Sequence, residues 1–383
     1  MGIYEKLGLK RVINAGGTYT ILGGSRMPPE VVEAWVEASK SFVDMEALHR
    51  KAGEVIAEVT GAEAGLVTSG ASGALLLQAA ACIASKDRER MKRLPHSEGM
   101  PNEIIFPGGP DEYANCYMAG GARIVTVGKN PAEFTQEEIE AVITEKTAAL
   151  GYIFYTPTGE EPLKRLIAVG KKHGIPVIVD AAAELPPVEN LRRLIAWGAD
   201  LVAFSGGKDI MGPNDTGILC GREDLVESAF TQACPHNLVG RALKVSKEDI
   251  IACITALRRY ASLDQEERKR EWEEKVRYWM REWADIPHVR VEIIYEGRKE
   301  EGRYVAQGWP RAWITVEEEA LGITVNQIGQ ALLKGDPSIY VNTKVSWGGV
   351  IPRSFTVNPH LLNDEEVEIV AHRLKEVLFC KTV

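Results

Sequence analysis

Between residues 61 and 221, short apolar runs typical of β-strands alternate with helical segments. Several runs are apolar throughout, which is typical of strands whose two faces are both covered by helices. Repeated β-then-α units predict a mostly parallel, doubly wound sheet that binds ligands at the carboxyl ends of its strands. The last strand follows a tight glycine-rich turn, which is compatible with an antiparallel direction. We expect strands at residues 65–68, 103–106, 123–127, 148–155, 177–179, 201–204 and 217–220, and helices at residues 73–84, 115–119, 136–144, 162–173 and 189–197.

The remainder of the chain predicts a second, smaller domain. Residues 247–284 are predicted to form a long helical region, densely charged in its second half, that connects two domains. After about residue 288 the pattern becomes α+β, with alternating strands, a helix at 324–334 and a final amphipathic helix at 365–379. We therefore expect a large α/β domain at residues 61–246, a smaller domain made of residues 1–60 and 285–383, and a connecting helical region at residues 247–284.

Charge and cysteine content disfavour several classes of protein. A net charge of −9 disfavours nucleic acids and anionic membranes as partners. The six cysteines are scattered, and Cys234-Pro235-His236 offers too few ligands for a zinc site, so we expect no metal. The sequence has no apolar run of about 18 residues and no secretory signal at its start. Scattered cysteines without a signal predict a cytoplasmic location.

A lysine and an aspartate follow two of the predicted strands. Asp180 ends the strand at 177–179, and Lys208 lies in a glycine-rich turn directly after the strand at 201–204. A lysine that can form an imine and an aspartate that can pair with a pyridinium nitrogen are the chemical minimum for pyridoxal phosphate (PLP). Desolvation in such a turn lowers the pKa of a lysine, which leaves the neutral amine that imine formation needs. Taken singly, Asp180 also fits a helix cap and Lys208 a solvated surface lysine.

A turn rich in small residues links the first strand of this region to a helix. Small side chains let backbone N–H groups approach an anion, and a helix N-terminus favours negative charge. The turn lacks the Walker and G-x-G-x-x-G patterns, but it suits a phosphate monoester, and Ser205 adds one more hydroxyl. Taken alone, it equally fits a tight strand–helix connection. The candidate phosphate-binding residues are Ser69, Gly70, Ala71, Ser72 and Ser205.

The order of these motifs is similar to that in PLP-dependent enzymes of fold type I. Over nearly its whole length, the chain resembles the family of bacterial selenocysteine synthase and its shorter, D-glucosaminate-6-phosphate ammonia-lyase-like relatives. The resemblance implies a seven-stranded large domain, Lys208 as the Schiff-base lysine, Asp180 as the pyridinium partner, and a homodimer with active sites at the subunit interface. Residues 14–18 and 241–247 would then face a neighbour's site. The segments that carry the resemblance are residues 11–20, 60–72, 198–208, 240–247 and 355–362.

The chain departs from the family pattern at one position. Relatives usually have a histidine just after the strand that ends near Phe106, where it stacks on the cofactor ring. Residues 107–113 contain no histidine, and Tyr113 is the candidate replacement, although a solvent-facing tyrosine fits equally well. Arg241 and Arg353 are candidates for binding a substrate carboxylate or phosphate, because a guanidinium forms paired hydrogen bonds with such groups.

These features predict a PLP-dependent lyase that catalyses α,β-elimination, of the ammonia-lyase type, on an amino acid or amino sugar acid. The elimination step comes from the family resemblance. A racemase, an aldolase or a β-replacement enzyme would use the same Cα chemistry. A selenocysteine-synthase-like transferase is disfavoured by the acidic charge and by the lack of the N-terminal extension that such enzymes use for tRNA. A PLP-fold protein without catalysis, acting as a binding partner, is the alternative of a different class.

Overall fold

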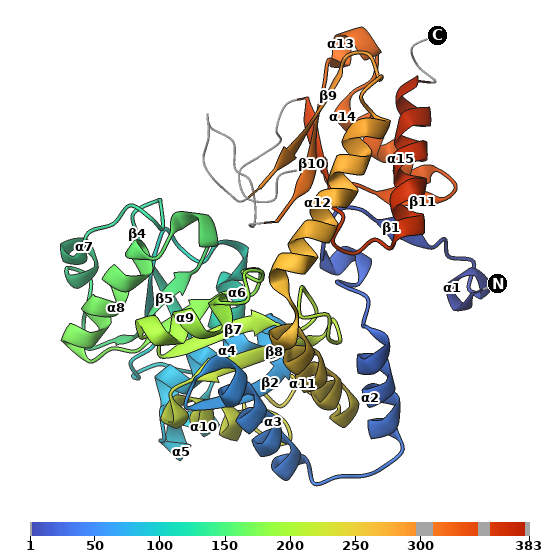
Figure 1. The fold of residues 1–383 in the computed structure, drawn as a ribbon. Helices are drawn as coiled ribbons and strands as arrows, with labels where there is room; N and C mark the ends of the chain where they lie inside the picture. The colour runs from blue at the N-terminus through green and yellow to red at the C-terminus, as the bar shows by residue number, and fades with distance from the viewer. Residues whose placement is uncertain (1, 296–308, 344–352, 380–383) are drawn as a thin grey trace. The chain divides into compact units, whose positions relative to one another are not determined.

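The computed structural model describes residues 2–295, 309–343 and 353–379, and it forms two compact units. The large unit comprises Arg26–Ser262, and the small unit combines Met1–Ser25 with Leu263–Val383 (Figure 1). Among the described residues, no helix has both the length and the apolar character that a membrane span requires.

A seven-stranded sheet forms the centre of the large unit. Its strands are parallel except β8, which runs antiparallel to both of its neighbours, β2 and β7. The predicted doubly wound, mostly parallel sheet is therefore confirmed, and its last strand in the chain, β8, is the antiparallel one. In sheet order the strands are β2 (Ala64–Ser69), β8 (Thr216–Gly221), β7 (Leu201–Ser205), β6 (Val177–Asp180), β5 (Thr147–Ile153), β3 (Glu103–Pro107) and β4 (Arg123–Val127).

Both faces of this sheet are buried, which explains its apolar strands. In β7, Leu201 and Ala203 belong to the hydrophobic core around helix α4 (Gly70–Ala84), and the intervening Val202 and Phe204 are also fully buried. Successive strand residues point to opposite faces, so the sheet is covered on both sides. The other helices of this unit are α2 (Pro29–Ser39), α3 (Met45–Thr60), α5 (Arg88–Arg93), α6 (Ala114–Ala119), α7 (Gln136–Glu140), α8 (Glu161–His173), α9 (Asn190–Trp197), α10 (Glu223–Gln232) and α11 (Lys247–Ser262), with the short 3₁₀ turns η2 (Asp111–Tyr113) and η3 (Thr156–Thr158).

The small unit has an α+β core built on Trp279 of helix α12 (Gln265–Glu282) and on Trp283 directly after that helix. Trp279 and Trp283 are fully buried, and their indole N–H groups donate to the carbonyls of Val367 and Ala371 in helix α15 at 2.9 and 3.0 Å. A three-stranded antiparallel sheet, β12-β10-β9, and a parallel pair, β1-β11, complete the unit. Its elements are α1 (Ile3–Lys6), β1 (Val12–Asn14), η1 (Thr20–Leu22), α12 (Gln265–Glu282), β9 (Val289–Ile294), β10 (Arg311–Val316), α13 (Glu318–Leu321), α14 (Val325–Lys334), β11 (Ser338–Tyr340), β12 (Ser354–Val357) and α15 (Asp364–Phe379).

The two units divide the chain differently from the predicted domains at two places. Residues 26–60, expected in the smaller domain, lie in the large unit because α2 packs on α11 and α3 packs on β2. Residues 247–284, expected as one connecting region, are two helices that belong to different units. The helical pattern is interrupted at Asp264, whose side chain accepts a hydrogen bond from the backbone N–H of Glu267 at 3.0 Å and so caps α12.

Candidate active site

The loop between β7 and β8 places Lys208 at the carboxyl end of the parallel strands. The backbone N–H of Gly206 donates to the carbonyl of Thr216 at 2.9 Å, which closes the loop. A Cβ atom on Gly207 would lie 2.3 Å from the Cα atom of Asn214, so the backbone here is too close for any residue except glycine. The glycine-rich sequence thus forms a tight turn in which Lys208 is half-buried.

Two buried carboxylates lie in electrostatic range of this lysine. Asp180, the last residue of β6, is 5% exposed, and its Oδ1 accepts a hydrogen bond from the N–H of Ala182 at 2.9 Å. Burial raises the pKa of Asp180, and the Ala182 N–H and the charge of Lys208 oppose that rise. Desolvation lowers the pKa of Lys208, and the negative charges of Asp180 and Glu184 oppose that fall. The structure therefore brings together the predicted lysine and aspartate.

Glu184 is a member of this cluster that sequence reasoning missed. It is 5% exposed, and its Oε2 accepts hydrogen bonds from both the N–H and the Oγ1 of Thr156, each at 2.7 Å. Burial raises the pKa of Glu184, while the two Thr156 hydrogen bonds and Lys208 oppose the rise. The sequence held one signal: Glu184 follows Asp180 by four positions inside an otherwise apolar stretch, where an acidic side chain needs a partner.

The predicted phosphate-binding turn opens helix α4, which begins three positions earlier than expected. Gly70 has φ +64°, and its N–H already donates to the carbonyl of Asp215 at 2.6 Å, so Gly70 shapes the turn. A Cβ atom on Gly217 would lie 2.3 Å from the backbone carbonyl carbon of Gly70, which shows how closely β8 approaches the turn. The side chains at Ser69 and Ala71 are half-buried and Ser72 is exposed, and the helix N-terminus favours an anion. Their phosphate contact, like that of half-buried Ser205 at the end of β7, stays a prediction.

Tyr113 lies near the same cluster. It ends η2 and is 38% exposed, and its pKa is raised by burial first and then by the negative charge of Asp180. The pKa of Tyr117 in α6 is also raised, by burial first and then by the negative charge of Asp180. Its fully buried hydroxyl has no hydrogen-bond partner in the described part of the chain. The ring-stacking role of Tyr113 stays a prediction.

The structure does not bring the candidate arginine of the large unit into the cluster. Arg241 is exposed, and its Nε donates to Asn237 Oδ1 at 3.2 Å. Arg353 belongs to the small unit, where its exposed guanidinium forms an ion pair with Glu319 at 2.7 Å. Neither contact indicates a site prepared for a substrate, and both substrate-binding roles stay predictions.

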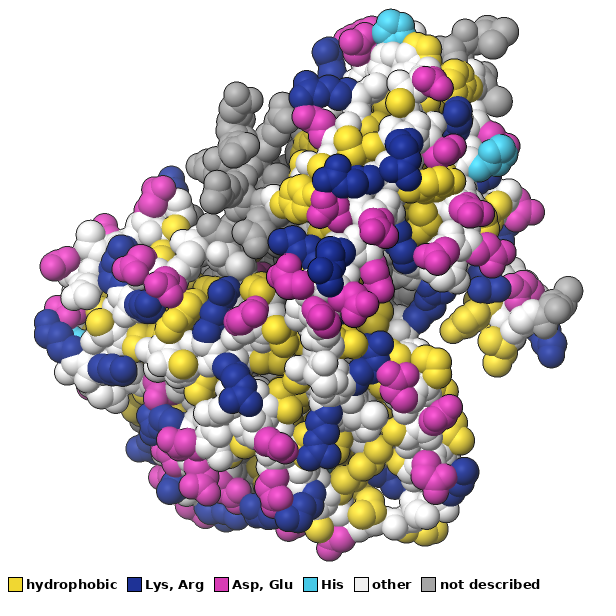
Figure 2. Space-filling model, in the orientation of Figure 1, with side chains coloured by type: hydrophobic (Ala, Val, Ile, Leu, Met, Phe, Trp, Pro, Cys, Tyr) yellow, Lys and Arg dark blue, Asp and Glu magenta, His cyan; other side chains and the backbone are white. Residues whose placement is uncertain are grey.

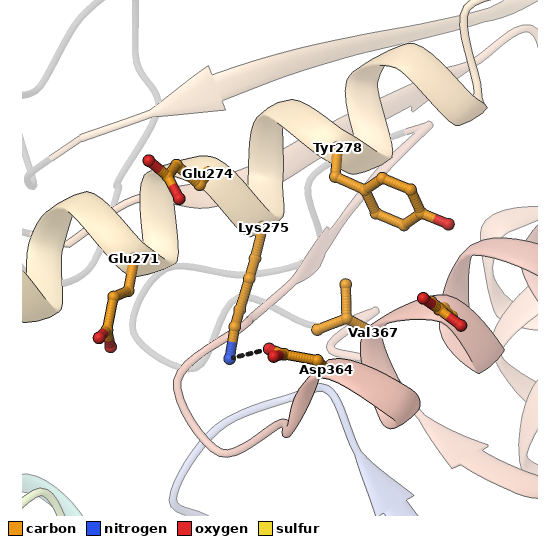
Figure 3. Close-up of a pocket in the computed structure, with 7 residues that line it drawn as sticks. Glu271, Glu274, Lys275, Tyr278, Asp364 and Val367 are labelled. Atoms are coloured by element: carbon orange, nitrogen blue, oxygen red, sulfur yellow. Dashed lines mark ion pairs between the residues drawn. The ribbon is translucent and has the colours of Figure 1, made fainter.

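A cavity of about 480 Å³ lies within the small unit between α12 and α15. Figure 3 shows Lys275 extending from α12 toward Asp364 at the start of α15, and their charged atoms are 3.4 Å apart. Lys275 Nζ also donates to the carbonyl of Leu362 at 2.8 Å. Asp364 is 96% exposed, so water screens the ion pair in this cavity. The acids near Lys208, in contrast, are buried. Within the described ranges, no group of three or more His, Cys, Asp or Glu residues is arranged to hold a metal.

The chain is similar to several known proteins over most of its length. The model of the SelA family, L-seryl-tRNA selenium transferase, matches residues 12–272. The chain is 33% identical to D-glucosaminate-6-phosphate ammonia lyase of Salmonella typhimurium, over 98% of this chain and 97% of the relative. It is also 33% identical to a 5'-C-glycyluridine monooxygenase-decarboxylase of a Streptomyces species, over 98% of this chain and 92% of the relative.

Solved structures extend the comparison to the fold. A structure of D-glucosaminate-6-phosphate ammonia-lyase matches with a TM-score of 0.84, 31% identity and full coverage of both chains. Serine palmitoyltransferase of Sphingomonas wittichii matches with a TM-score of 0.59 over 97% of this chain and 88% of that chain, at 17% identity, which is a likeness of fold alone. The chain therefore belongs to the SelA family, L-seryl-tRNA selenium transferase, within the PLP-dependent enzymes of fold type I.

Proposed function

We propose that this protein is a PLP-dependent ammonia-lyase that acts on an amino acid or amino sugar acid. The observation that carries the proposal is the half-buried amine of Lys208 beside the buried carboxylates of Asp180 and Glu184 at the carboxyl ends of β6 and β7. The ammonia-lyase activity and the amino sugar acid are those named for the Salmonella relative, with which this chain shares nearly its whole length.

The residues present fit the cofactor. Lys208 Nζ is the amine that would bond the aldehyde carbon of PLP, and the buried Asp180 carboxylate is the partner for its pyridine nitrogen. The first turn of α4 has the small side chains and helix N-terminus that a phosphate group requires. When bound, PLP supplies an electron sink for the negative charge that develops at the substrate Cα atom. The residues proposed to hold the phosphate are Ser69, Gly70, Ala71, Ser72 and Ser205.

Lys208 is proposed to move the reacting proton. Desolvation lowers the pKa of Lys208, which shifts the amine toward its neutral form. Once the substrate amine has replaced it at the cofactor, the neutral Nζ would accept the proton from the substrate Cα atom while the bond between Cβ and its leaving group breaks. Water would then release the substrate nitrogen as ammonia and leave a 2-oxo acid. Asp180 provides the fixed negative charge opposite the lysine, at a buried position where it is weakly screened.

The Streptomyces relative favours a second candidate reaction, an oxidative decarboxylation. That relative is as similar in identity as the ammonia lyase and is named a monooxygenase-decarboxylase. The two reactions differ in what they consume and release: elimination releases ammonia without oxygen, whereas a monooxygenase-decarboxylase consumes oxygen and releases carbon dioxide. Measurement of ammonia, dissolved oxygen and carbon dioxide with one panel of amino acids and amino sugar acids separates them. Racemisation, aldol cleavage and β-replacement would appear in the same panel as substrate turnover with neither ammonia release nor oxygen consumption.

A homodimer in the cytoplasm completes the proposal. The side chains of Val32 and Val36 in α2 and of Phe42 and Val43 just after it are exposed, although all four are apolar. Figure 2 shows yellow side chains on the large unit in the area where Figure 1 places α2. Apolar side chains at a surface are typical of subunit interfaces, and we propose a second copy of this chain as the partner. Light scattering of the purified protein tests the dimer, and a monomer would contradict it.

The decisive experiment concerns the lysine. Purified protein supplemented with PLP is expected to show the visible absorbance of a lysine-bound cofactor, and Lys208→Ala is expected to lose it. Ammonia release from an amino sugar acid or an amino acid would then identify the lyase reaction. A wild-type protein without the visible band would reject the PLP assignment, and bound PLP without any substrate turnover would favour the non-catalytic alternative.

A further inference from the structure

Glu184 connects two loops of the active site. Its Oε2 accepts both hydrogen bonds from Thr156, which lies in η3 after β5, while Glu184 itself lies in the loop after β6. Asn190 at the start of α9 completes the contact, because its Nδ2 donates to Thr156 Oγ1 at 3.1 Å and to the carbonyl of Glu184 at 2.5 Å. Segments that are separate in the chain are thus held together by one buried carboxylate.

The same carboxylate adds a second negative charge near one amine. Strands β6 and β7 pair in parallel with Asp180 opposite Ala203, so the loop that holds Glu184 and the turn that holds Lys208 both leave the same edge of the sheet. Among the described residues, the negative charges of Asp180 and Glu184 act on Lys208 from this edge. Glu184 in turn faces the charges of Lys208 and Asp180 and the two donors of Thr156. A pyridine nitrogen needs only one acidic partner, so Asp180 suffices for that role. A second buried carboxylate is costly unless its contacts compensate the lost hydration, which indicates a separate task for Glu184.

We propose that Glu184 is a positioning residue for Lys208, which fixes the loop after β5 through Thr156 and supplies the charge that keeps the lysine amine a competent proton acceptor. This inference rests on the proposed function of Lys208. Desolvation alone makes the amine a weak base, and the added negative charge strengthens its hold on a proton without exposing it to water. The hydrogen bonds with Thr156 keep that charge in one place.

The test measures the protonation of Lys208 in the apoprotein. Acetic anhydride labels neutral amines, and mass spectrometry reads the labelled fraction of Lys208 at each pH. Glu184→Gln removes the charge, and its amide oxygen can still accept from Thr156. The pKa of Lys208 then falls, so the midpoint of labelling moves to lower pH and labelling at neutral pH rises severalfold. Glu103→Gln is the matched control, because Glu103 is equally buried at the amino end of β3, away from the site, and it leaves the midpoint unchanged. An unchanged midpoint in Glu184→Gln would overturn the proposal.

Two further variants separate charge from folding. Thr156→Val keeps the charge and loses the hydroxyl donor, so the loop after β5 is expected to become more accessible to hydrogen exchange. If Glu184→Gln does not fold, Thr156→Val combined with Glu184→Met removes the carboxylate and the hydroxyl at similar volume, leaves only the N–H of residue 156 without its acceptor, and is expected to give the same downward shift of the labelling midpoint. A wild-type midpoint in the double variant would overturn the proposal equally. Because the labelling uses no PLP, it decides the role of Glu184 even if wild-type protein fails to bind PLP and the proposed function falls.

Discussion

Two lysines of this protein have acidic partners, and their surroundings differ. Lys208 in the large unit lies near Asp180 and Glu184, each 5% exposed, whereas Lys275 in the small unit pairs with Asp364, which is 96% exposed. Burial raises the pKa of both acids near Lys208 and lowers that of the lysine. Lys275 is 21% exposed, but water screens its pair with Asp364 from the acid's side, so that ion pair contributes roughly 0–1 kcal/mol to stability. The comparison teaches that desolvation, more than the proximity of a lysine and an acid, makes a site reactive.

Replacement of the two lysines should give the largest contrast. Lys208→Ala is expected to abolish the visible cofactor band and to reduce turnover by at least about 10²–10⁴-fold, because the proton acceptor is lost. Lys275→Ala is expected to leave the band and turnover unchanged and to lower the free energy of unfolding by about 1–2 kcal/mol, because it loses the screened ion pair and the hydrogen bond to the Leu362 carbonyl. Absorbance spectra, ammonia release and denaturant unfolding measure the three effects. Equal losses in both variants would contradict the comparison.

Replacement of the acids should give the next effect. Asp180→Asn keeps the shape of the side chain and removes the buried charge, so turnover is expected to fall by roughly 100-fold or more. Asp364→Asn changes only an exposed carboxylate and is expected to leave turnover at the wild-type level. Steady-state assays on both variants, each saturated with PLP, provide the measurement. Full activity in Asp180→Asn would show that the pyridine nitrogen has another partner.

The tightness of the turn that buries Lys208 can be tested at Gly207. Gly207→Ala places a Cβ atom 2.3 Å from Asn214 Cα, and the backbone must shift, so we expect a loss of about 1–3 kcal/mol in the free energy of unfolding and a weaker cofactor band. Gly73→Ala in α4 is the matched control, because the nearest atom to its Cβ is 3.6 Å away and alanine favours a helix. It is expected to be neutral or stabilising. Equal unfolding free energies for Gly207→Ala and Gly73→Ala would show that the turn around Lys208 accepts a Cβ atom at position 207 without strain.

The parts of this molecule that follow from the sequence are those encoded locally. Apolar runs with turn residues between them predicted the sheet, and the strand ends placed Asp180 and Lys208 on one edge of it. The capping signal at Asp264 was also local, but the continuous charge pattern around it concealed the break between α11 and α12. Contacts between distant segments were not predictable. Trp35 Nε1 donates to Asp249 Oδ1 at 2.8 Å across 214 positions, and contacts of this kind assign residues 26–60 to the large unit.

The burial of Glu184 likewise depends on distant partners. Thr156 lies 28 positions away, and both hydrogen bonds to Glu184 exist only once β5 and β6 are adjacent in the sheet. The apolar stretch around Glu184 indicated burial, but the sequence could not name the donor. Residue roles that act through such contacts therefore require the structure, whereas a reactive residue at a strand end does not.

The smallest expected effect is a pH dependence of stability at Glu184. Burial raises the folded-state pKa of Glu184 above its ordinary value of 4.5, so the folded protein holds the proton of this acid to a higher pH than the unfolded chain does. Stability from this group is present below about pH 4.5 and is lost as the pH rises through the folded-state pKa, because the unfolded state then releases its proton first. Glu184→Gln has no such titration.

The difference in unfolding free energy between Glu184→Gln and wild type should therefore move in favour of the variant as the pH rises from acid to neutral. Denaturant unfolding at a series of pH values measures this difference. An exposed carboxylate such as Asp364 has no desolvation to relieve, so the difference between Asp364→Asn and wild type is expected to stay constant over the same range. The difference in unfolding free energy between Glu184→Gln and wild type could instead stay constant or move against the variant as the pH rises. Burial would then not be the dominant influence on the pKa of Glu184. The contrast between the two lysine sites would in that case depend on Asp180 alone.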